Sequence, residues 1–264
     1  MAMITLSTLP LVLGAGSGVG VGFTLGLVGG GGSILAVPLL VYLVGVASPH
    51  VAIGTSAVAV AANAAMSLAS HARLGNVRWP CGGAFAAFGI AGAFLGAQLG
   101  KMVDGQSLLA AFAGMMAVVA VLMLRRREAG EDRMVRLNRQ NAPRLLAGGL
   151  GVGLLSGFFG IGGGFLIVPA IVFATGMPML QAIGTSLLAV TAFGLTTATS
   201  YAAAGYVDWL LAATFIGGGM LGSVLGTRAG RRLARRRGLL TKVFAGLILA
   251  VSAYVLVRSV GATG

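Results

Sequence analysis

Long apolar runs that carry almost no charge constrain this chain more than any other feature. Ten such runs lie near 9–28, 33–47, 51–70, 80–100, 106–124, 144–160, 165–176, 181–204, 209–227 and 239–257. Most approach the roughly 20 residues that a helix needs to cross a hydrocarbon core of about 30 Å. Only 9% of the residues are charged, against about 25% in a soluble domain. We therefore expect an all-α integral membrane protein with the lipid bilayer as its surroundings.

The apolar runs belong to an internal repeat. A nearly constant offset, close to half the length of the chain, relates Pro38 to Pro169, Trp79 to Trp209, and Gly54-Thr55-Ser56 to Gly184-Thr185-Ser186. So many matching positions in one order indicate a tandem duplication. We expect repeat 1 over 1–124, a basic linker over 125–143 and repeat 2 over 144–264.

Basic residues predict how the repeats are oriented, because loops rich in Lys and Arg stay in the cytoplasm. Seven Arg lie from Arg125 to Arg144 and six from Arg228 to Arg237. The loop with Arg73 and Arg78 is basic, whereas its counterpart in repeat 2 is not. The basic loops thus change places between the copies, which predicts inverted repeats with both termini outside the cytoplasm. Inverted repeats recur in secondary transporters.

Each short apolar run follows a glycine cluster, at 29–32 and at 160–164. Consecutive glycines weaken a helix by nearly 1 kcal/mol each, so we expect a break followed by a short helix that starts at Ser33 or Gly164. Such starts direct unpaired N–H groups and about half a positive charge toward the membrane centre, where they form an anion site. A purely structural re-entrant hairpin is the alternative. Isolated glycines are expected to serve close helix packing.

Hydroxyl groups extend from each Gly-Thr-Ser motif at helical spacing. From Ser56 the line passes Asn63, Ser67 and Ser70, and from Ser186 it passes Phe193, Thr197 and Ser200. Such hydroxyls either bond to their own helix or donate to a permeating oxyanion. The expected substrate-binding residues are Gly30, Gly31, Gly32, Ser33, Thr55, Ser56, Asn63, Gly162, Gly163, Gly164, Thr185 and Ser186. Structural roles are expected for Pro38, Pro169, Trp79 and Trp209.

The acidic residues favour an anion as substrate. All five, which are Asp104, Glu128, Glu131, Asp132 and Asp208, lie in loops or at segment ends. Cation pathways and proton relays usually need a carboxylate inside the membrane.

A single cysteine, Cys81, excludes an intramolecular disulfide and a Cys metal cluster, and we expect no metal or cofactor. His50 and His71 lie at segment ends and are expected at the interface. No basic residue is interleaved with aromatics as nucleic-acid binding requires.

In these motifs the chain resembles the sulfite exporter TauE/SafE family of membrane permeases. The resemblance rests on Gly-Xaa-Gly-Gly-Gly/Ser with Pro38 or Pro169 downstream, on both Gly-Thr-Ser motifs, and on a glycine shortly before Trp79 or Trp209. It covers nearly the whole chain. It implies a multi-pass protein of the bacterial cytoplasmic (inner) membrane that moves sulfite, sulfonates or related organosulfur anions.

The leading hypothesis is a secondary transporter, in the export direction that the resemblance implies. It works by alternating access between the inverted repeats, as one repeat rocks against the other. A passive anion channel on the same fold is one alternative. An intramembrane serine hydrolase that uses Ser17 or Ser156 is another, although it would need a histidine at matching depth, and we expect no enzyme. The glycine-rich helix faces could pack within one chain or between two chains, so a homodimer is a further alternative.

Overall fold

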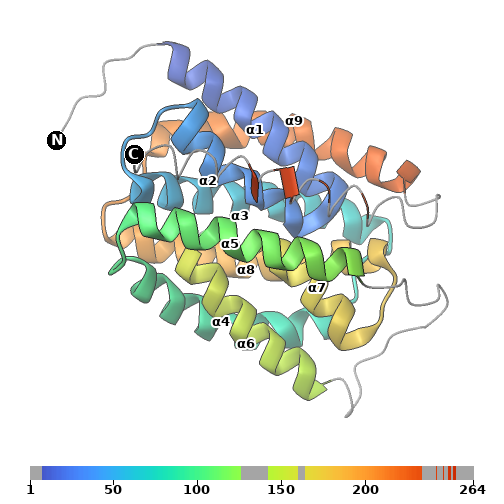
Figure 1. Ribbon diagram of the computed structural model, residues 1–264. Helices are drawn as coiled ribbons and strands as arrows, with labels where there is room; N and C mark the ends of the chain where they lie inside the picture. The colour runs from blue at the N-terminus through green and yellow to red at the C-terminus, as the bar shows by residue number, and fades with distance from the viewer. Residues whose placement is uncertain are drawn as a thin grey trace.

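The structure is a computed structural model that describes residues 8–125, 142–159, 164–233, 242, 246, 249–250 and 252–253. These residues form a helical bundle without β-strands (Figure 1). The long helices are α1 (Thr8–Val28), α3 (Pro49–Arg73), α4 (Trp79–Gly100), α5 (Gly105–Arg125), α6 (Ala142–Phe159), α8 (Met179–Ala203) and α9 (Trp209–Leu233). Six of them, all except α5, are long and apolar enough to cross a membrane. The predicted all-helical, multi-pass class is confirmed.

The first glycine cluster breaks the chain after α1. Gly29 has a φ of +68°, a left-handed conformation that glycine adopts at little cost. The chain then forms the 3-10 helix η1 (Gly29–Leu35), one turn of α-helix α2 (Ala36–Pro38) and the π-helix η2 (Leu39–Leu43). The expected helix start at Ser33 is therefore wrong. Because the first glycine of the cluster makes the turn, helical structure resumes four residues earlier, and Ser33 lies inside η1.

The second short segment is α7 (Gly164–Thr175), which contains Pro169. Both segments are too short to count as spans, as the lengths of their apolar runs predict. Both prolines, Pro38 and Pro169, are buried in them. Gly162 and Gly163 lie outside the described residues, as do residues 126–141 of the linker and most of the run at 239–257.

Glycines determine how closely two pairs of long helices pack. In α1, Gly18 lies against Phe215 of α9 and Gly26 lies against Ser223, so the two helices run parallel. A Cβ atom at either glycine would overlap the α9 backbone. The helices α4 and α6 also pack in parallel, through Gly89, Gly92, Gly96, Gly100, Gly149, Gly153 and Gly157. The predicted packing role of the isolated glycines is confirmed. We call the α1–α9 and α4–α6 contacts the two glycine seams, and each seam joins the first half of the chain to the second (Figure 1).

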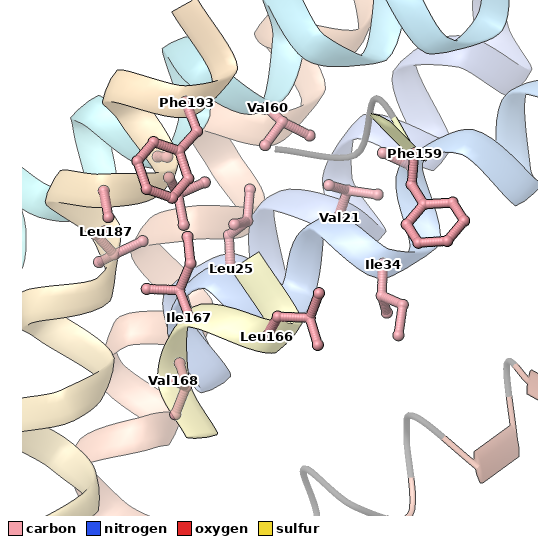
Figure 2. Close-up of a cluster of buried hydrophobic side chains, with 14 of the residues drawn as sticks. Val21, Leu25, Ile34, Val60, Phe159, Leu166, Ile167, Val168, Leu187 and Phe193 are labelled. Atoms are coloured by element: carbon pink, nitrogen blue, oxygen red, sulfur yellow. The ribbon is translucent and has the colours of Figure 1, made fainter. Parts of the chain in front are cut away.

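Between the two seams, α3 packs against α8. Gly54 lies against Tyr201, and Ala61 lies against Gly194, so these two helices run antiparallel. The short segments η1 and α7 pack against each other beside them. Figure 2 shows the buried apolar side chains that gather there, among them Leu25 of α1, Ile34 of η1, Ile167 of α7 and Leu187 of α8. The core of the molecule therefore lies where the two short segments meet.

Candidate functional site

The first glycine cluster contacts the second half of the chain directly. The N–H of Gly30 donates to Oγ of Ser186 at 3.2 Å, and that hydroxyl donates to the carbonyl oxygen of Ile183 at 2.8 Å. Gly29 packs so closely that a Cβ there would lie 2.8 Å from the same carbonyl oxygen. All of these groups are buried. The structure thus brings together two predicted site residues, Gly30 and Ser186, that are far apart in the sequence.

The rest of this cluster bonds within its own half. The hydroxyl of Ser33 donates to the carbonyl oxygen of Gly30 at 2.9 Å, and the hydroxyl of Thr24 in α1 donates to that of Gly32 at 3.2 Å. Gly31 continues η1 between them. These bonds hold η1 against the last turns of α1. They leave the start of η1, with its helix dipole, directed at α8.

The threonine of each Gly-Thr-Ser motif binds the opposite half of the chain. Oγ1 of Thr55 accepts from the N–H of Asp208 at 2.9 Å, and Oγ1 of Thr185 accepts from the N–H of Arg78 at 3.0 Å. Asp208 and Arg78 directly precede α9 and α4. Because α3 and α8 are antiparallel, Thr55 and Thr185 lie at opposite ends of the pair. The structure does not bring them together at one site.

The glycine of the same motif makes this contact sterically feasible. A Cβ at Gly184 would lie 2.5 Å from the carbonyl oxygen of Asn76, in the turn before α4. At Gly54 it would overlap the carbonyl oxygen of Tyr206, in the turn before α9. The Ser56 hydroxyl donates to its own helix, at the carbonyl oxygen of Ile53. In each Gly-Thr-Ser motif, the glycine therefore leaves room for a turn from the other half of the chain, and the threonine hydroxyl accepts a hydrogen bond from the residue that follows that turn.

Asn63 is fully buried against Gly219 of α9. Neither its amide nitrogen nor its oxygen has a hydrogen-bond partner among the described residues, and the hydroxyls of Ser67 and Thr197 are unpartnered as well. The counterpart of Asn63 in the second repeat is Phe193, which stacks on Phe85 with ring centroids 6.1 Å apart. An unpartnered buried polar group costs about 1–3 kcal/mol. Such groups call for an explanation, such as a water or ligand that they contact in function.

The aromatic residues that open α4 and α9 are exposed, at 53% for Trp79 and 65% for Trp209. They lie at opposite ends of the bundle, since α3 and α8 are antiparallel. This placement suits aromatic residues at the two membrane interfaces.

The structure also places several other polar residues. His71 is buried, at 1% exposure, with Nε2 3.3 Å from the carbonyl oxygen of Gly26. The side chain of His71 is therefore enclosed by α1 at the end of α3, a contact that the sequence did not predict. The hydroxyls of Ser17 and Ser156 have no hydrogen-bond partner in the described part of the chain, and no described histidine is hydrogen-bonded to either of them.

Sequence reasoning also missed a contact at the ends of α4 and α8. There Lys101 donates to Ser200, and Gln98 donates to the same hydroxyl. The repeat offset was the available signal, because it places Arg231 and Ser70 at the positions that correspond to Lys101 and Ser200.

Comparisons with known proteins identify relatives that are described as membrane transporters. The family model described as "Sulfite exporter TauE/SafE" matches residues 14–255. A "Probable membrane transporter protein" from Xylella fastidiosa (strain 9a5c) is 51% identical over 250 residues, which cover 94% of this chain and 96% of the relative. "Probable membrane transporter protein YdhB" from Bacillus subtilis (strain 168) is 28% identical over 236 residues, 86% of this chain and 95% of that protein. No solved structure gives a significant match.

Proposed function

We propose that this chain, which belongs to the sulfite exporter TauE/SafE family of membrane transporters, is a secondary transporter that exports small sulfur-containing oxyanions or organosulfonates across the bacterial inner membrane. The contact between Gly30 and Ser186 carries the proposal. It places the start of a broken helix against a hydroxyl from the other half of the chain. The six candidate spans around it contain no Asp or Glu, so an anion meets no fixed negative charge there.

In this proposal an oxyanion binds where the hydroxyl oxygen of Ser186 now accepts from the Gly30 N–H. The first N–H groups of η1 lack partners inside the helix and carry its positive dipole end. Gly31 and Gly32 present no side chain, so a ligand oxygen reaches the backbone. The hydroxyls of Ser33 and Ser56 and the amide of Asn63 are further donors. In the second half, Gly162, Gly163 and Gly164 take the equivalent role before α7.

We also propose that the two halves are inverted relative to each other. The antiparallel packing of α3 and α8 supports this, because the sequence repeat makes these helices equivalent. A pair of equivalent spans that run in opposite directions implies opposite orientations in the membrane. Under the positive-inside rule, the linker at 125–143 then lies in the cytoplasm.

The glycine seams suggest which parts move during alternating access. Because α1 packs on α9 and α4 packs on α6, each seam joins the two halves through backbone contacts. A motion of one repeat against the other would break both seams. We therefore propose that the moving units are α1 with α9 and α4 with α6, and that they pivot about the α3–α8 contact.

Transport assays test the proposal. Protein in proteoliposomes should take up sulfite and short alkanesulfonates in preference to carboxylates, with saturation and counterflow, and runs with and without a pH gradient report the coupling. A passive channel would show neither saturation nor counterflow. Sulfite and sulfonate uptake no faster than in protein-free liposomes would refute the function.

A matched pair of variants tests the site. Ser186→Ala should reduce uptake at least about tenfold, the loss of one hydrogen bond to a charged group. Thr191→Ala is the control, because the Thr191 hydroxyl bonds only to Leu187 of the same helix, and its uptake should match the wild type. Equal uptake by both variants, each shown to be folded by its melting temperature, would exclude Ser186 from the site.

A further inference from the structure

The last turns of α4 and α8 meet at one end of the bundle, the end at which α5 begins. Nζ of half-buried Lys101 donates to Oγ of Ser200 at 3.0 Å and to its carbonyl oxygen at 3.4 Å. Nε2 of Gln98 donates to the same Oγ at 3.5 Å. Nζ also lies 5.9 Å from the ring centroid of Tyr201. A cation and an amide therefore meet at one hydroxyl, and the cation lies over an aromatic ring.

This cluster has more hydrogen-bond donors than acceptors. Because Oγ of Ser200 accepts from both Lys101 and Gln98, its own proton points elsewhere, and no described group accepts it. The Tyr201 side chain is fully buried, and its hydroxyl has no partner among the described residues. Unused donors beside a positive charge suit an oxyanion, because it supplies acceptors and negative charge together.

The opposite end of the bundle keeps part of this set of residues. The repeat offset makes Arg231 the counterpart of Lys101, Ser70 that of Ser200, and His71 that of Tyr201. Nδ1 of His71 is buried without a partner in the described part of the chain, like the Tyr201 hydroxyl. Among the described residues, however, no hydrogen bond joins Arg231 to Ser70. The two ends therefore share a cation and a serine, and in the described part of the chain only the end with Lys101 joins them by a hydrogen bond.

We propose that Gln98, Lys101, Ser200 and Tyr201 form a second anion-binding site, which holds a small oxyanion at this mouth of the transporter. Lys101 supplies the charge, the two hydroxyls donate to ligand oxygens, and the buried Tyr201 ring closes the site on one side. The proposal deepens the transport function and rests on it for its physiological role. Binding itself does not require transport and is measured separately.

Anion-dependent melting of the purified protein tests this site, with sodium sulfite and sodium ethanesulfonate as probes and sodium chloride as the ionic-strength control. The Ser186→Ala background removes the proposed central site. In that background both anions should still raise the melting temperature, and Lys101→Met should increase the half-saturating concentration about tenfold or more, the loss of one charge-assisted hydrogen bond. Lys101→Arg should retain most of the affinity. Lys242→Met is the control, because Lys242 is exposed.

Two results would overturn the second site. In the first, Lys101→Met leaves the half-saturating concentration of both anions unchanged but lowers the melting temperature measured without anion. This result would mean that Lys101 only caps the end of α8. The other is no stabilisation of the Ser186→Ala protein by either anion beyond that of sodium chloride. Failure of wild-type uptake in proteoliposomes would instead refute the transport proposal and leave the binding result to stand by itself.

Discussion

Replacing Thr55 and Thr185 with valine tests how the two halves of the chain hold each other. Both threonines are fully buried, and each hydroxyl accepts from one peptide N–H, that of Asp208 at 2.9 Å or that of Arg78 at 3.0 Å. Valine keeps the shape and leaves that N–H without an acceptor. An unsatisfied donor of this kind costs about 1–3 kcal/mol. Each variant should therefore lower the free energy of unfolding by about 1–3 kcal/mol.

The separation of the two contacts predicts that their effects add. Thr55 follows Gly54, which lies against Tyr201. Thr185 precedes Tyr201 in α8 by sixteen residues, about 24 Å along a helix. Sites this far apart are usually additive within about 0.5 kcal/mol. The double variant should lose the sum of the two single losses.

Reversible unfolding in mixed micelles, titrated with a denaturing detergent, measures all three variants. Thr191→Val is the matched control, because its hydroxyl bonds only within its own helix, and it should change the free energy by less than about 0.5 kcal/mol. The reasoning is refuted if Thr55→Val and Thr185→Val cost no more than the control. A double variant that departs from additivity by more than about 1 kcal/mol would show that the two contacts are not at separate ends.

Two further predictions concern packing and the buried amide. Gly22→Ala should lower the melting temperature sharply, because its Cβ would overlap the backbone of Gly219, whereas Gly20→Ala meets nothing within 4 Å and should leave it unchanged or raise it; equal melting of the two would contradict the parallel α1–α9 seam. Asn63→Leu should keep or raise stability, since it removes a buried amide that has no partners among the described residues at a cost of about 1–3 kcal/mol. Sulfite uptake should nevertheless fall, and wild-type uptake by this variant would exclude Asn63 from the anion path.

The sequence predicted those parts of the fold that depend on local pattern. Run length separated the long helices from the two short segments, and the duplicated glycines anticipated close packing. Gly75 and Gly205 are a matched pair in the repeat, and both have positive φ, at 71° and 77°, in the turns after α3 and α8. Gly45 and Gly176 are a second matched pair and share this property after the short segments. In these positions the repeat preserves glycine because the backbone needs it.

Contacts between distant segments were not predictable in the same way. Four successive glycines do not reveal which one turns, so the start of η1 at Gly29 was missed. The threonines of the Gly-Thr-Ser motifs were expected to donate to a ligand, and the structure adds a role that was not predicted, since each accepts from a turn of the opposite half. That partnership depends on the antiparallel packing of α3 and α8, which hydropathy does not encode. The same is true of Lys101 and Ser200, which come from different helices.

Sided labelling of two equivalent cysteines tests the inverted arrangement most directly. Leu74→Cys and Ala204→Cys occupy matching exposed positions after α3 and α8, and both are made with the buried Cys81 replaced by alanine. In intact cells, a membrane-impermeant maleimide should modify the cysteine at position 204 and reach the one at position 74 only after the membrane is opened. Modification of both positions from the same side of the membrane would contradict the account.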